Sequence, residues 1–260
     1  MSTERLDVRR VAAGVGGGAI ALAAALVLSA GWRPDEAGIL ALLLRWTPHL
    51  VSAYGANLGM GAAAMIVATL GGGALGLLLT SRPAVARPAL WLTLGLRNLP
   101  WLAVIFFVMY LTPFEVEIGG RYVPVPGWAK TIFGLALPAC GYVAEIVRGG
   151  ISSVPTAQWE AAAALGLGRW QTLTRVILPI ALRRMTPPWI NMLCTVMLAT
   201  SLGSVVGVEE LLMAVQDLIA SETRQDVAFW AYAYAMGLFF LTIQPAALLS
   251  RRLERQWRDS

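Results

Sequence analysis

Few side chains in this sequence are of the types that carry catalysis or bind metals. Cys140 and Cys194 each lie in an apolar run without a second Cys or a His at metal-ligand spacing, which favours a buried packing role. His49 is the single histidine and lies beside Pro48 at the start of an apolar stretch, where an interfacial residue is favoured over a ligand or base. The sequence predicts no catalytic residue, no metal site and no cofactor.

Lys130 is the single lysine of the sequence, and its surroundings exclude a phosphate-binding loop. A phosphate-binding loop of the form G-x-x-x-x-G-K-[ST] needs a lysine in that pattern, and no such pattern is present. The chain therefore cannot itself be a P-loop ATPase. With 57% hydrophobic and 13% charged residues and a mean hydropathy of +0.66, it is too apolar for an ordinary soluble domain. The net charge of +5 has a topological explanation, so no nucleic-acid partner is predicted.

A basic, helix-forming segment from Gln158 to Pro179 interrupts the apolar runs. Pro155, after polar residues that can cap a helix, is a helix start signal. The strong helix formers that follow end at Gly166 and Gly168, and glycine is the usual residue for a left-handed turn at a helix end. A second, basic helix is predicted from Arg169 to about Ile177. Pro179 then predicts a break before the next span, which Pro187 and Pro188 start.

Neither short helix is long or apolar enough to span a bilayer, so the pair either docks a protein or lies on lipid headgroups. Four alanines, Ala161 to Ala164, favour the protein partner, because they bury little surface in a bilayer but offer a flat face to a groove. Trp159 would be the large anchor of that contact and Glu160 its charge.

Six apolar runs are candidates for membrane-spanning helices, which need about 20 residues each. The third is the weakest, because Arg97, Asn98 and Pro100 interrupt it. The sequence thus predicts an all-α, polytopic membrane protein with about six transmembrane helices. The runs are Val11 to Ala30, Val51 to Thr80, Trp101 to Leu111 with part of Leu90 to Leu96, Thr131 to Val147, Trp189 to Val208, and Val227 to Ser250.

The chain is expected to form one membrane domain. Residues 1–50 would be an N-terminal extra span and outer loop, 51–250 a membrane-spanning core with a cytoplasmic loop at 150–183, and 251–260 a cytoplasmic tail. The first run could instead be a signal peptide that is cleaved after Leu28-Ser29-Ala30, but its apolar stretch is longer than usual for one.

Basic residues are distributed unevenly between the two sides. With both termini in the cytoplasm, the inner segments hold fourteen and the outer segments five, with Arg97 at the edge of the third run. Short cytoplasmic loops carry such an excess, so segment 158–179 is predicted to face the cytoplasm. The inner residues are Arg5, Arg9, Arg10, Arg82, Arg87, Arg148, Arg169, Arg175, Arg183, Arg184, Arg251, Arg252, Arg255 and Arg258; the outer residues are Arg33, Arg45, Arg121, Lys130 and Arg224.

Small and polar residues within the runs mark helix contacts or a pathway. The pairs Gly55 and Gly59, then Gly72 and Gly76, favour close helix packing, although lining a pathway stays open. Glu145 and Arg148 lie three residues apart and can pair on one helix face. Helix-packing, ion-pair or interfacial roles are favoured for the polar residues at membrane depth. The candidates for a pathway or gating role are Asn57, Arg97, Glu145, Thr200 and Ser201.

The segment "EAAAALGLGRWQTLTRVILP" resembles the cytoplasmic loop of binding-protein-dependent ABC importer permeases. That pattern is E-A-A, three residues, G, nine residues, I-x-L-P, and here Val176 stands in place of its Ile. "LRNLPWLAVIFF", "PPWIN" and "TSLGSVVGVEEL" are similar to the polar amino-acid branch, which includes histidine, glutamate, glutamine, arginine and opine transporters. Ala157, Leu198 and Ala199 depart from that branch, and the last two remove a charge near the pathway. The matching residues are Glu160, Ala161, Ala162, Gly166, Leu178 and Pro179.

The resemblance implies a type I ABC importer transmembrane-domain fold in a bacterial inner membrane. It also implies three kinds of partner: cytoplasmic ATP-binding subunits, a second permease copy or a homologous permease, and an extracytoplasmic solute-binding protein. The residues that would couple ATPase motion to the spans are Trp159, Glu160, Ala161, Ala162, Gly166, Leu178 and Pro179. Two other classes remain open: a transporter or channel driven by an ion gradient, and a membrane subunit that docks a partner without transporting.

Overall fold

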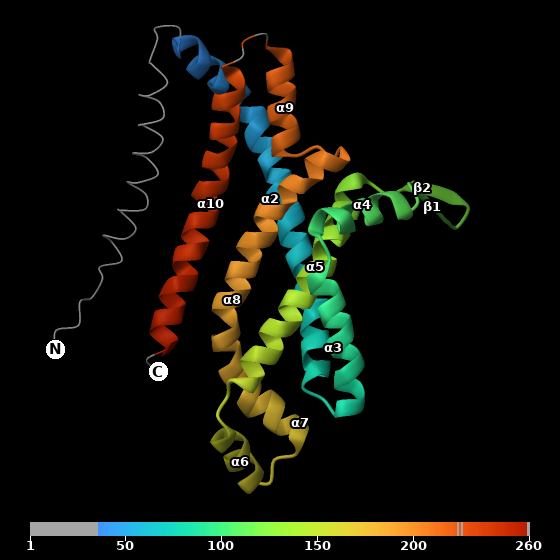
Figure 1. The fold of residues 1–260 in the computed structure, drawn as a ribbon, viewed down its shortest axis with the longest axis vertical. Coiled ribbons are helices and arrows are strands. Elements are labelled where there is room, and N and C mark those ends of the chain that lie inside the picture. The colour runs from blue at the N-terminus through green and yellow to red at the C-terminus, as the bar shows by residue number, and fades with distance from the viewer. Residues whose placement is uncertain (1–35, 223, 225, 259–260) are drawn as a thin grey trace, which may run out of the picture. The chain divides into compact units, whose positions relative to one another are not determined.

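The computed structural model describes residues 36–222, 224 and 226–258, so the expected first span at 11–30 lies outside the described residues. The chain divides into two compact units, Met1–Trp46 and Thr47–Ser260, and the second contains the core and the grooves. The described residues form helices and one short hairpin (Figure 1), which confirms the all-α fold class. The elements are α2 Glu36–Leu79, α3 Pro83–Asn98, α4 Trp101–Leu111, β1 Glu115–Ile118, β2 Arg121–Pro124, α5 Gly127–Ser152, α6 Thr156–Ala164, α7 Arg169–Thr172, α8 Leu178–Ala199 followed by a short 3-10 helix Thr200–Val206, α9 Leu211–Ser221 and α10 Val227–Arg258.

Four helical stretches in the described part are long and apolar enough to cross a membrane, and a bent helix pair would make a fifth. Three of them overlap the expected second, fourth and sixth runs, and the remaining one overlaps the expected fifth run but begins at Arg169, 20 residues before Trp189. Residues 36–50, expected as part of an N-terminal span and outer loop, already belong to α2. Pro48 lies inside α2. The four stretches are Gly38–Leu79, Gly127–Ser152, Arg169–Val206 and Val227–Trp257.

The third expected span is not one continuous helix. Helices α3 and α4 meet at an angle of 97°, with Leu99 and Pro100 between them. Leu99 has φ −73° and ψ 133°, the extended conformation that a following proline imposes, and the proline nitrogen has no proton for a helical bond. The Asn-Leu-Pro sequence therefore turns the chain sharply instead of kinking one span.

A two-stranded antiparallel hairpin follows α4, which we did not predict from the sequence. Its register pairs Glu115 with Pro124 and Ile118 with Arg121. The two-residue turn is Gly119-Gly120, with φ of 60° and 77°, values that two-residue hairpin turns require and glycine allows at no steric cost.

Helix α5 is anchored at its start by the buried side chain of Lys130. Its Nζ donates to the carbonyl oxygens of Met109 and Thr112, at 3.1 and 3.0 Å, and lies 3.8 Å from the centre of the Phe114 ring. Carbonyls at the end of a helix lack intrahelical partners and attract a cation. Lys130 therefore closes the end of α4 and joins it to α5.

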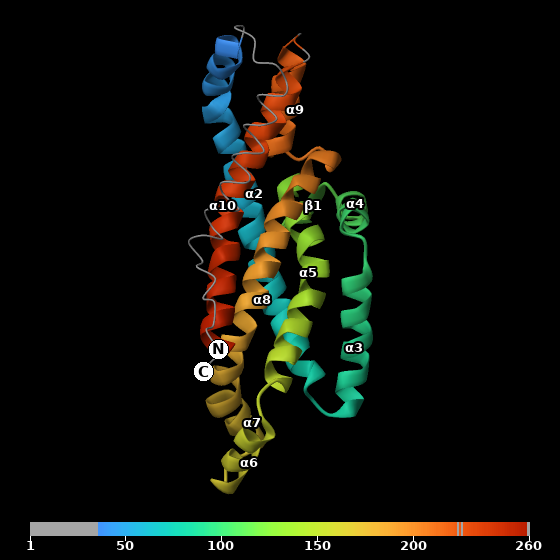
Figure 2. The same cartoon turned by 60° about the vertical axis from the view of Figure 1, so that its left-hand side comes forward.

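The core lies where α2, α5 and α8 run side by side, as Figures 1 and 2 show from two directions. Gly72 and Gly76 of α2 face Val143 and Val147 of α5, so closely that an added Cβ would lie 2.7 and 2.6 Å from the two valine Cβ atoms. This pair of small residues serves helix packing, as expected. A Cβ at Gly55 or Gly59 would meet nothing within 4 Å.

We predict that Gly72→Ala destabilises the protein by about 1–3 kcal/mol, because the new methyl group would overlap the Cys140 carbonyl and Val143. The neighbouring Gly73→Ala is the matched control, since a Cβ there meets nothing within 4 Å and alanine favours a helix. Thermal unfolding in detergent should show a lower melting temperature for Gly72→Ala alone. Equal melting temperatures for the two variants would contradict the close packing of α2 on α5.

Candidate functional site

Helix α6 ends at a glycine, as the sequence predicts. Gly166 has φ +75°, a left-handed conformation that favours glycine. Its N–H donates to the Ala163 carbonyl at 2.9 Å, and the Leu167 N–H donates to the Ala162 carbonyl at 3.2 Å. These two bonds form a Schellman motif, which satisfies carbonyls that the helix end would otherwise leave without a partner. The turn reverses the chain direction between α6 and α7.

The second short helix does not end at a break before the next span, which corrects that expectation. Helix α7 passes through a π-helical turn, Leu173–Ile177, directly into α8, and Pro179 lies in the first turn of α8. The π-helical turn carries the helix up to Leu178, whose N–H donates to the Leu173 carbonyl, so the helix continues although Pro179 has no N–H to donate. Pro187 and Pro188 lie inside α8. The segment after Gly168 is thus continuous with a membrane-spanning helix.

The faces of α6 differ from the expected arrangement. Ala162 is buried, and Trp159 is half-buried against a cluster that includes Ile177 and Met185. Glu160 and Ala161 are exposed. Trp159 therefore packs within the chain, whereas we expected it to be the anchor for a partner.

Two large apolar side chains that we did not select from the sequence flank the glycine turn. Leu165 is 80% exposed and Trp170 is 68% exposed. The signal that could have found them is their position, since each stands close to a glycine stop in a segment predicted to face water. Exposed apolar side chains around an exposed helix end are suited to contact another protein.

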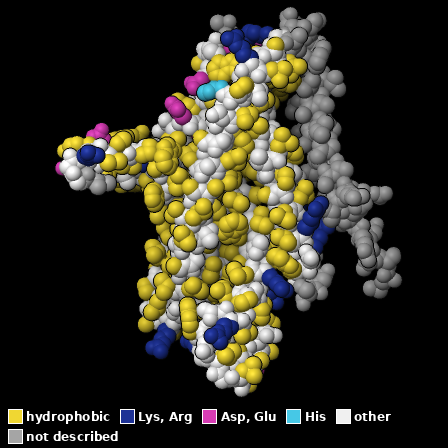
Figure 3. Space-filling model, turned by 180° about the vertical axis from the view of Figure 1, so that it is seen from behind, with side chains coloured by type: hydrophobic (Ala, Val, Ile, Leu, Met, Phe, Trp, Pro, Cys, Tyr) yellow, Lys and Arg dark blue, Asp and Glu magenta, His cyan; other side chains and the backbone are white. Residues whose placement is uncertain are grey.

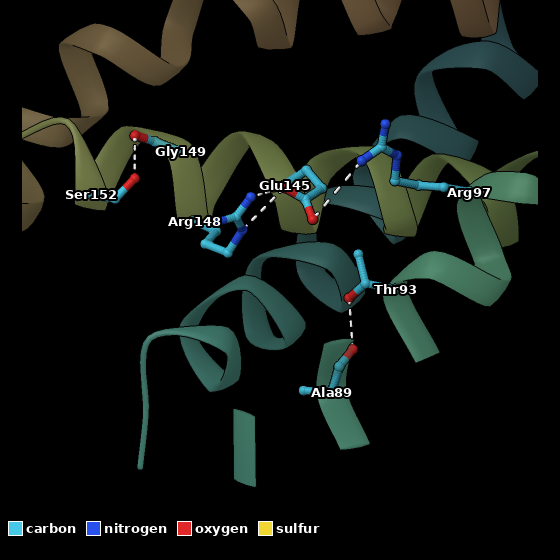
Figure 4. Close-up of polar contacts among 7 residues, drawn as sticks. All are labelled: Ala89, Thr93, Arg97, Glu145, Arg148, Gly149 and Ser152. Atoms are coloured by element: carbon cyan, nitrogen blue, oxygen red, sulfur yellow. Dashed lines mark hydrogen bonds and ion pairs between the residues drawn. The ribbon is translucent and has the colours of Figure 1, made fainter. Parts of the chain in front are cut away.

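A second region is a groove of about 670 Å³ lined by one charged residue from each of α3, α5 and α8: Arg97, Glu145 and Arg184. The Glu145 carboxylate accepts hydrogen bonds from Arg148 Nε at 3.0 Å and Nη2 at 2.6 Å, which confirms the expected pairing (Figure 4). Arg97 lies 3.9 Å from Glu145, too far for a hydrogen bond, and its guanidinium lies 5.3 Å from the centre of the Tyr142 ring. The groove residues are Arg97, Trp101, Tyr142, Glu145, Ile146, Gly149, Gly150, Ser153, Arg184, Pro188, Asn191, Met192 and Thr195.

The other polar candidates lie elsewhere. Asn57 and Thr200 are buried and do not line this groove; the Asn57 amide donates to Thr200 Oγ1 at 3.0 Å. Ser201 donates to the Leu198 carbonyl of its own helical segment. Asn191 and Thr195 of α8 do line the groove, although we did not select them as pathway residues.

Asn57 and Glu210 together hold the start of α9. The Asn57 amide donates to Glu210 Oε2 at 2.6 Å, and its carbonyl oxygen accepts from the Leu211 N–H at 2.9 Å. Glu210 Oε1 accepts from the N–H groups of Leu212 and Met213, at 2.9 and 3.2 Å. Burial raises the pKa of Glu210, which lies between two spans, while hydrogen bonds oppose the shift, first among them that from Asn57. Two side chains therefore satisfy three N–H groups of the first turn of α9.

We predict that Glu210→Ala loosens α9, because it removes two buried acceptors from backbone N–H groups, at a cost of about 2 kcal/mol. Hydrogen exchange followed by mass spectrometry should show amides at the start of α9 exchanging on the order of tenfold faster or more. Glu209→Ala is the control, since Glu209 is exposed and adjacent. If both variants exchanged like the parent protein, Glu210 would not hold this helix.

These features define a polytopic helical membrane protein in which α6 and the glycine turn after it lie outside the candidate spans. The chain belongs to the family of binding-protein-dependent transport system inner membrane components, which matches residues 68–255. The resemblance noted in the sequence is thereby confirmed.

Similar proteins of known name are amino-acid permeases. The probable amino-acid ABC transporter permease protein YckA of Bacillus subtilis is 34% identical over 166 residues, covering 64% of this chain and 71% of that protein. The glutamine transport system permease protein GlnP of Escherichia coli is 33% identical over 164 residues, covering 63% and 71%. The L-cystine transport system permease protein TcyB of Bacillus subtilis is 32% identical over 183 residues, covering 67% and 75%.

Solved structures share the fold. An amino acid ABC transporter solved with histidines has a TM-score of 0.70 at 24% identity, over 82% of this chain and 96% of that one. The inward-facing MetNI methionine ABC transporter has a TM-score of 0.62 at 19% identity, over 78% of this chain and 95% of that one. These likenesses confirm the type I ABC importer transmembrane-domain fold.

Proposed function

We propose that this permease imports polar amino acids or related small solutes, driven by separate cytoplasmic ATP-binding subunits and supplied by an extracytoplasmic solute-binding protein. It would pair with a second copy of itself or with a homologous permease, and it would have no ATPase site of its own. The observation that carries the proposal is the exposed α6, which a left-handed Gly166 closes and which leads through α7 into a spanning helix. Family membership and the amino-acid substrates named for the similar permeases support it.

The coupling proposal rests on how α6 is joined to the rest of the chain. Trp159 packs against the cluster that contains Ile177, at the end of the π-helical turn, and α7 continues through that turn into α8. A push on the exposed face of α6 would therefore move α8, which carries Asn191 and Thr195 of the groove. Through such a link, the ATPase contact at α6 and the groove lined by α8 can each shift the same conformational equilibrium. On this proposal Glu160, Ala161 and Gly166 contact the ATPase. Leu178 and Pro179 fix the direction in which α8 enters the membrane.

Charge supports the proposed orientation, with α6 and α7 in the cytoplasm. On the face shown in Figure 3, basic side chains lie around the end that carries α6 and α7, whereas the acidic side chains in view lie nearer the other end, together with some basic ones. A broad hydrophobic band separates the two ends. Cytoplasmic segments carry the excess of Arg and Lys, so the α6–α7 end would face the cytoplasm, and so would the two termini.

We predict that Glu160→Lys lowers both copurification of the ATP-binding subunits and solute uptake by roughly tenfold or more. A hydrogen bond to a charged group contributes about 1.5–3 kcal/mol, and the substitution adds repulsion to its loss. Gln158→Lys is the matched control, because Gln158 is exposed on the same helix but points about 200° away. Uptake that survives Glu160→Lys and depletion of ATP would instead support an ion-gradient transporter.

The groove supplies a place for the solute. Arg97 has no hydrogen bond with Glu145, so its guanidinium can receive a carboxylate, whereas Glu145 is already bonded to Arg148. Asn191 and Thr195 add uncharged polar groups from the facing helix α8. We therefore assign Arg97 to carboxylate binding and Glu145 to the ion pair with Arg148.

We predict that Arg97→Gln raises the half-saturation concentration for uptake by roughly tenfold or more, since a charged hydrogen bond of about 1.5–3 kcal/mol is lost. Uptake by proteoliposomes at graded solute concentrations measures it. Arg87→Gln on the same helix is the control, because Arg87 is exposed and does not line the groove. A change in maximal rate alone, with the half-saturation concentration unaltered, would exclude Arg97 from solute binding.

A further inference from the structure

A second, strongly basic groove of about 650 Å³ lies where α8 and α10 meet. It contains four arginines and one glutamate, and of its residues only Arg184 and Pro188 also line the groove assigned to the solute. The residues of this basic groove are Arg183, Arg184, Pro187, Pro188, Arg251, Glu254, Arg255 and Trp257.

The positive charge of the basic groove is not balanced within the described part of the chain. There, Arg183, Arg251 and Arg255 make no hydrogen bond or ion pair, whereas Arg184 donates to the Ser153 carbonyl. Like charges held in one groove repel one another, so the arrangement is favourable only with an anion between them. Guanidinium groups bind phosphate through paired hydrogen bonds.

The walls of the basic groove are fixed, so the arginines are held near one another. The buried Ser250 hydroxyl donates to the Pro187 carbonyl at 3.0 Å and ties α10 to α8. Arg251 and Arg255 are four residues apart, on one face of α10. The groove is therefore a property of the helix pair and does not depend on flexible side chains meeting by chance.

Its place along the helices identifies the kind of anion. The apolar stretch of α10 that can span the membrane ends at Trp257, which is half-buried and lines the groove. Tryptophan is enriched at the level of lipid headgroups, and basic pockets between helix ends on the cytoplasmic side suit anionic headgroups. A phosphate at this depth belongs to a lipid whose acyl chains lie along the hydrophobic band.

We propose that this basic groove binds the phosphate headgroup of an anionic phospholipid. Arg251 and Arg255 hold the phosphate from α10, Arg183 holds it from α8, and Trp257 packs against the glycerol region. Arg184 also lines the solute groove, so lipid bound here lies next to the pathway. Lipid binding does not depend on which solute the chain carries, and it is measured without transport.

The test is native mass spectrometry of the full-length protein in detergent, titrated with phosphatidylglycerol or with phosphatidylcholine. The dissociation constant of the first bound phosphatidylglycerol should be lower than that of phosphatidylcholine. The double variant Arg251→Gln with Arg255→Gln should raise the dissociation constant for phosphatidylglycerol roughly fivefold for each arginine removed. Each basic residue near a membrane surface contributes about that factor to binding. Arg252→Gln is the matched control, because Arg252 is exposed on the same turn and does not line the groove.

Further variants and a competitor distinguish a lipid site from diffuse attraction and from a site for free anions. Arg251→Lys with Arg255→Lys keeps the charge and should retain most of the preference, and size-exclusion chromatography checks that each variant is folded. Equal loss in Arg252→Gln would mean diffuse attraction and would overturn the site. A large excess of inorganic phosphate that displaced the phosphatidylglycerol would also overturn the proposal, because it would identify a site for free anions.

Discussion

Backbone N–H and C=O groups have no water to bond in the hydrocarbon core of a membrane, so each must find a partner within the protein. Long helices meet this demand along their length, and the difficulty lies at their ends. Lys130 closes the end of α4, and Asn57 with Glu210 holds the start of α9. Several polar side chains that could be mistaken for pathway residues therefore serve the backbone.

The same constraint separates structural polar residues from residues that are free to meet a solute. Asn57 and Thr200 are buried and bonded to each other, so they have little left to offer a ligand. Arg97 makes no hydrogen bond with Glu145: it contacts the Tyr142 ring and forms a 3.9 Å ion pair with Glu145. Polar groups of α5 and α8 line the same groove as Arg97, so on our proposal the solute binds in this groove and not at the Asn57 cluster.

Local signals predicted much of the fold. The helix end at Gly166 and the Glu145–Arg148 pair depend on residues that are near one another in the sequence, and the structure confirms both. Of the expected spans, the first lies outside the described residues, the third is a helix pair bent by 97°, and the fifth begins 20 residues before Trp189. Other features needed three-dimensional information. The continuity through Pro179 depends on the π-helical turn that precedes it, which the sequence could not distinguish from a break. The hydrogen bond between Asn57 and Glu210 at the start of α9 joins residues 153 positions apart, and no local sequence pattern predicts it.

The alanines of α6 acquire a physical meaning from the two environments of that helix. Ala162 is buried, and its small side chain lets α6 lie close to its neighbours, while Trp159 packs against the cluster that contains Ile177. Ala161 is exposed, so on our proposal its small side chain lets the ATPase approach equally closely. Because α6 has small side chains on two faces, it can pack closely both on the permease and, on our proposal, on the ATPase. Close-packed surfaces compress little, so a movement of the ATPase would be passed on to the permease. The larger exposed side chains, Leu165 and Trp170, lie beside the glycine turn at the end of this helix.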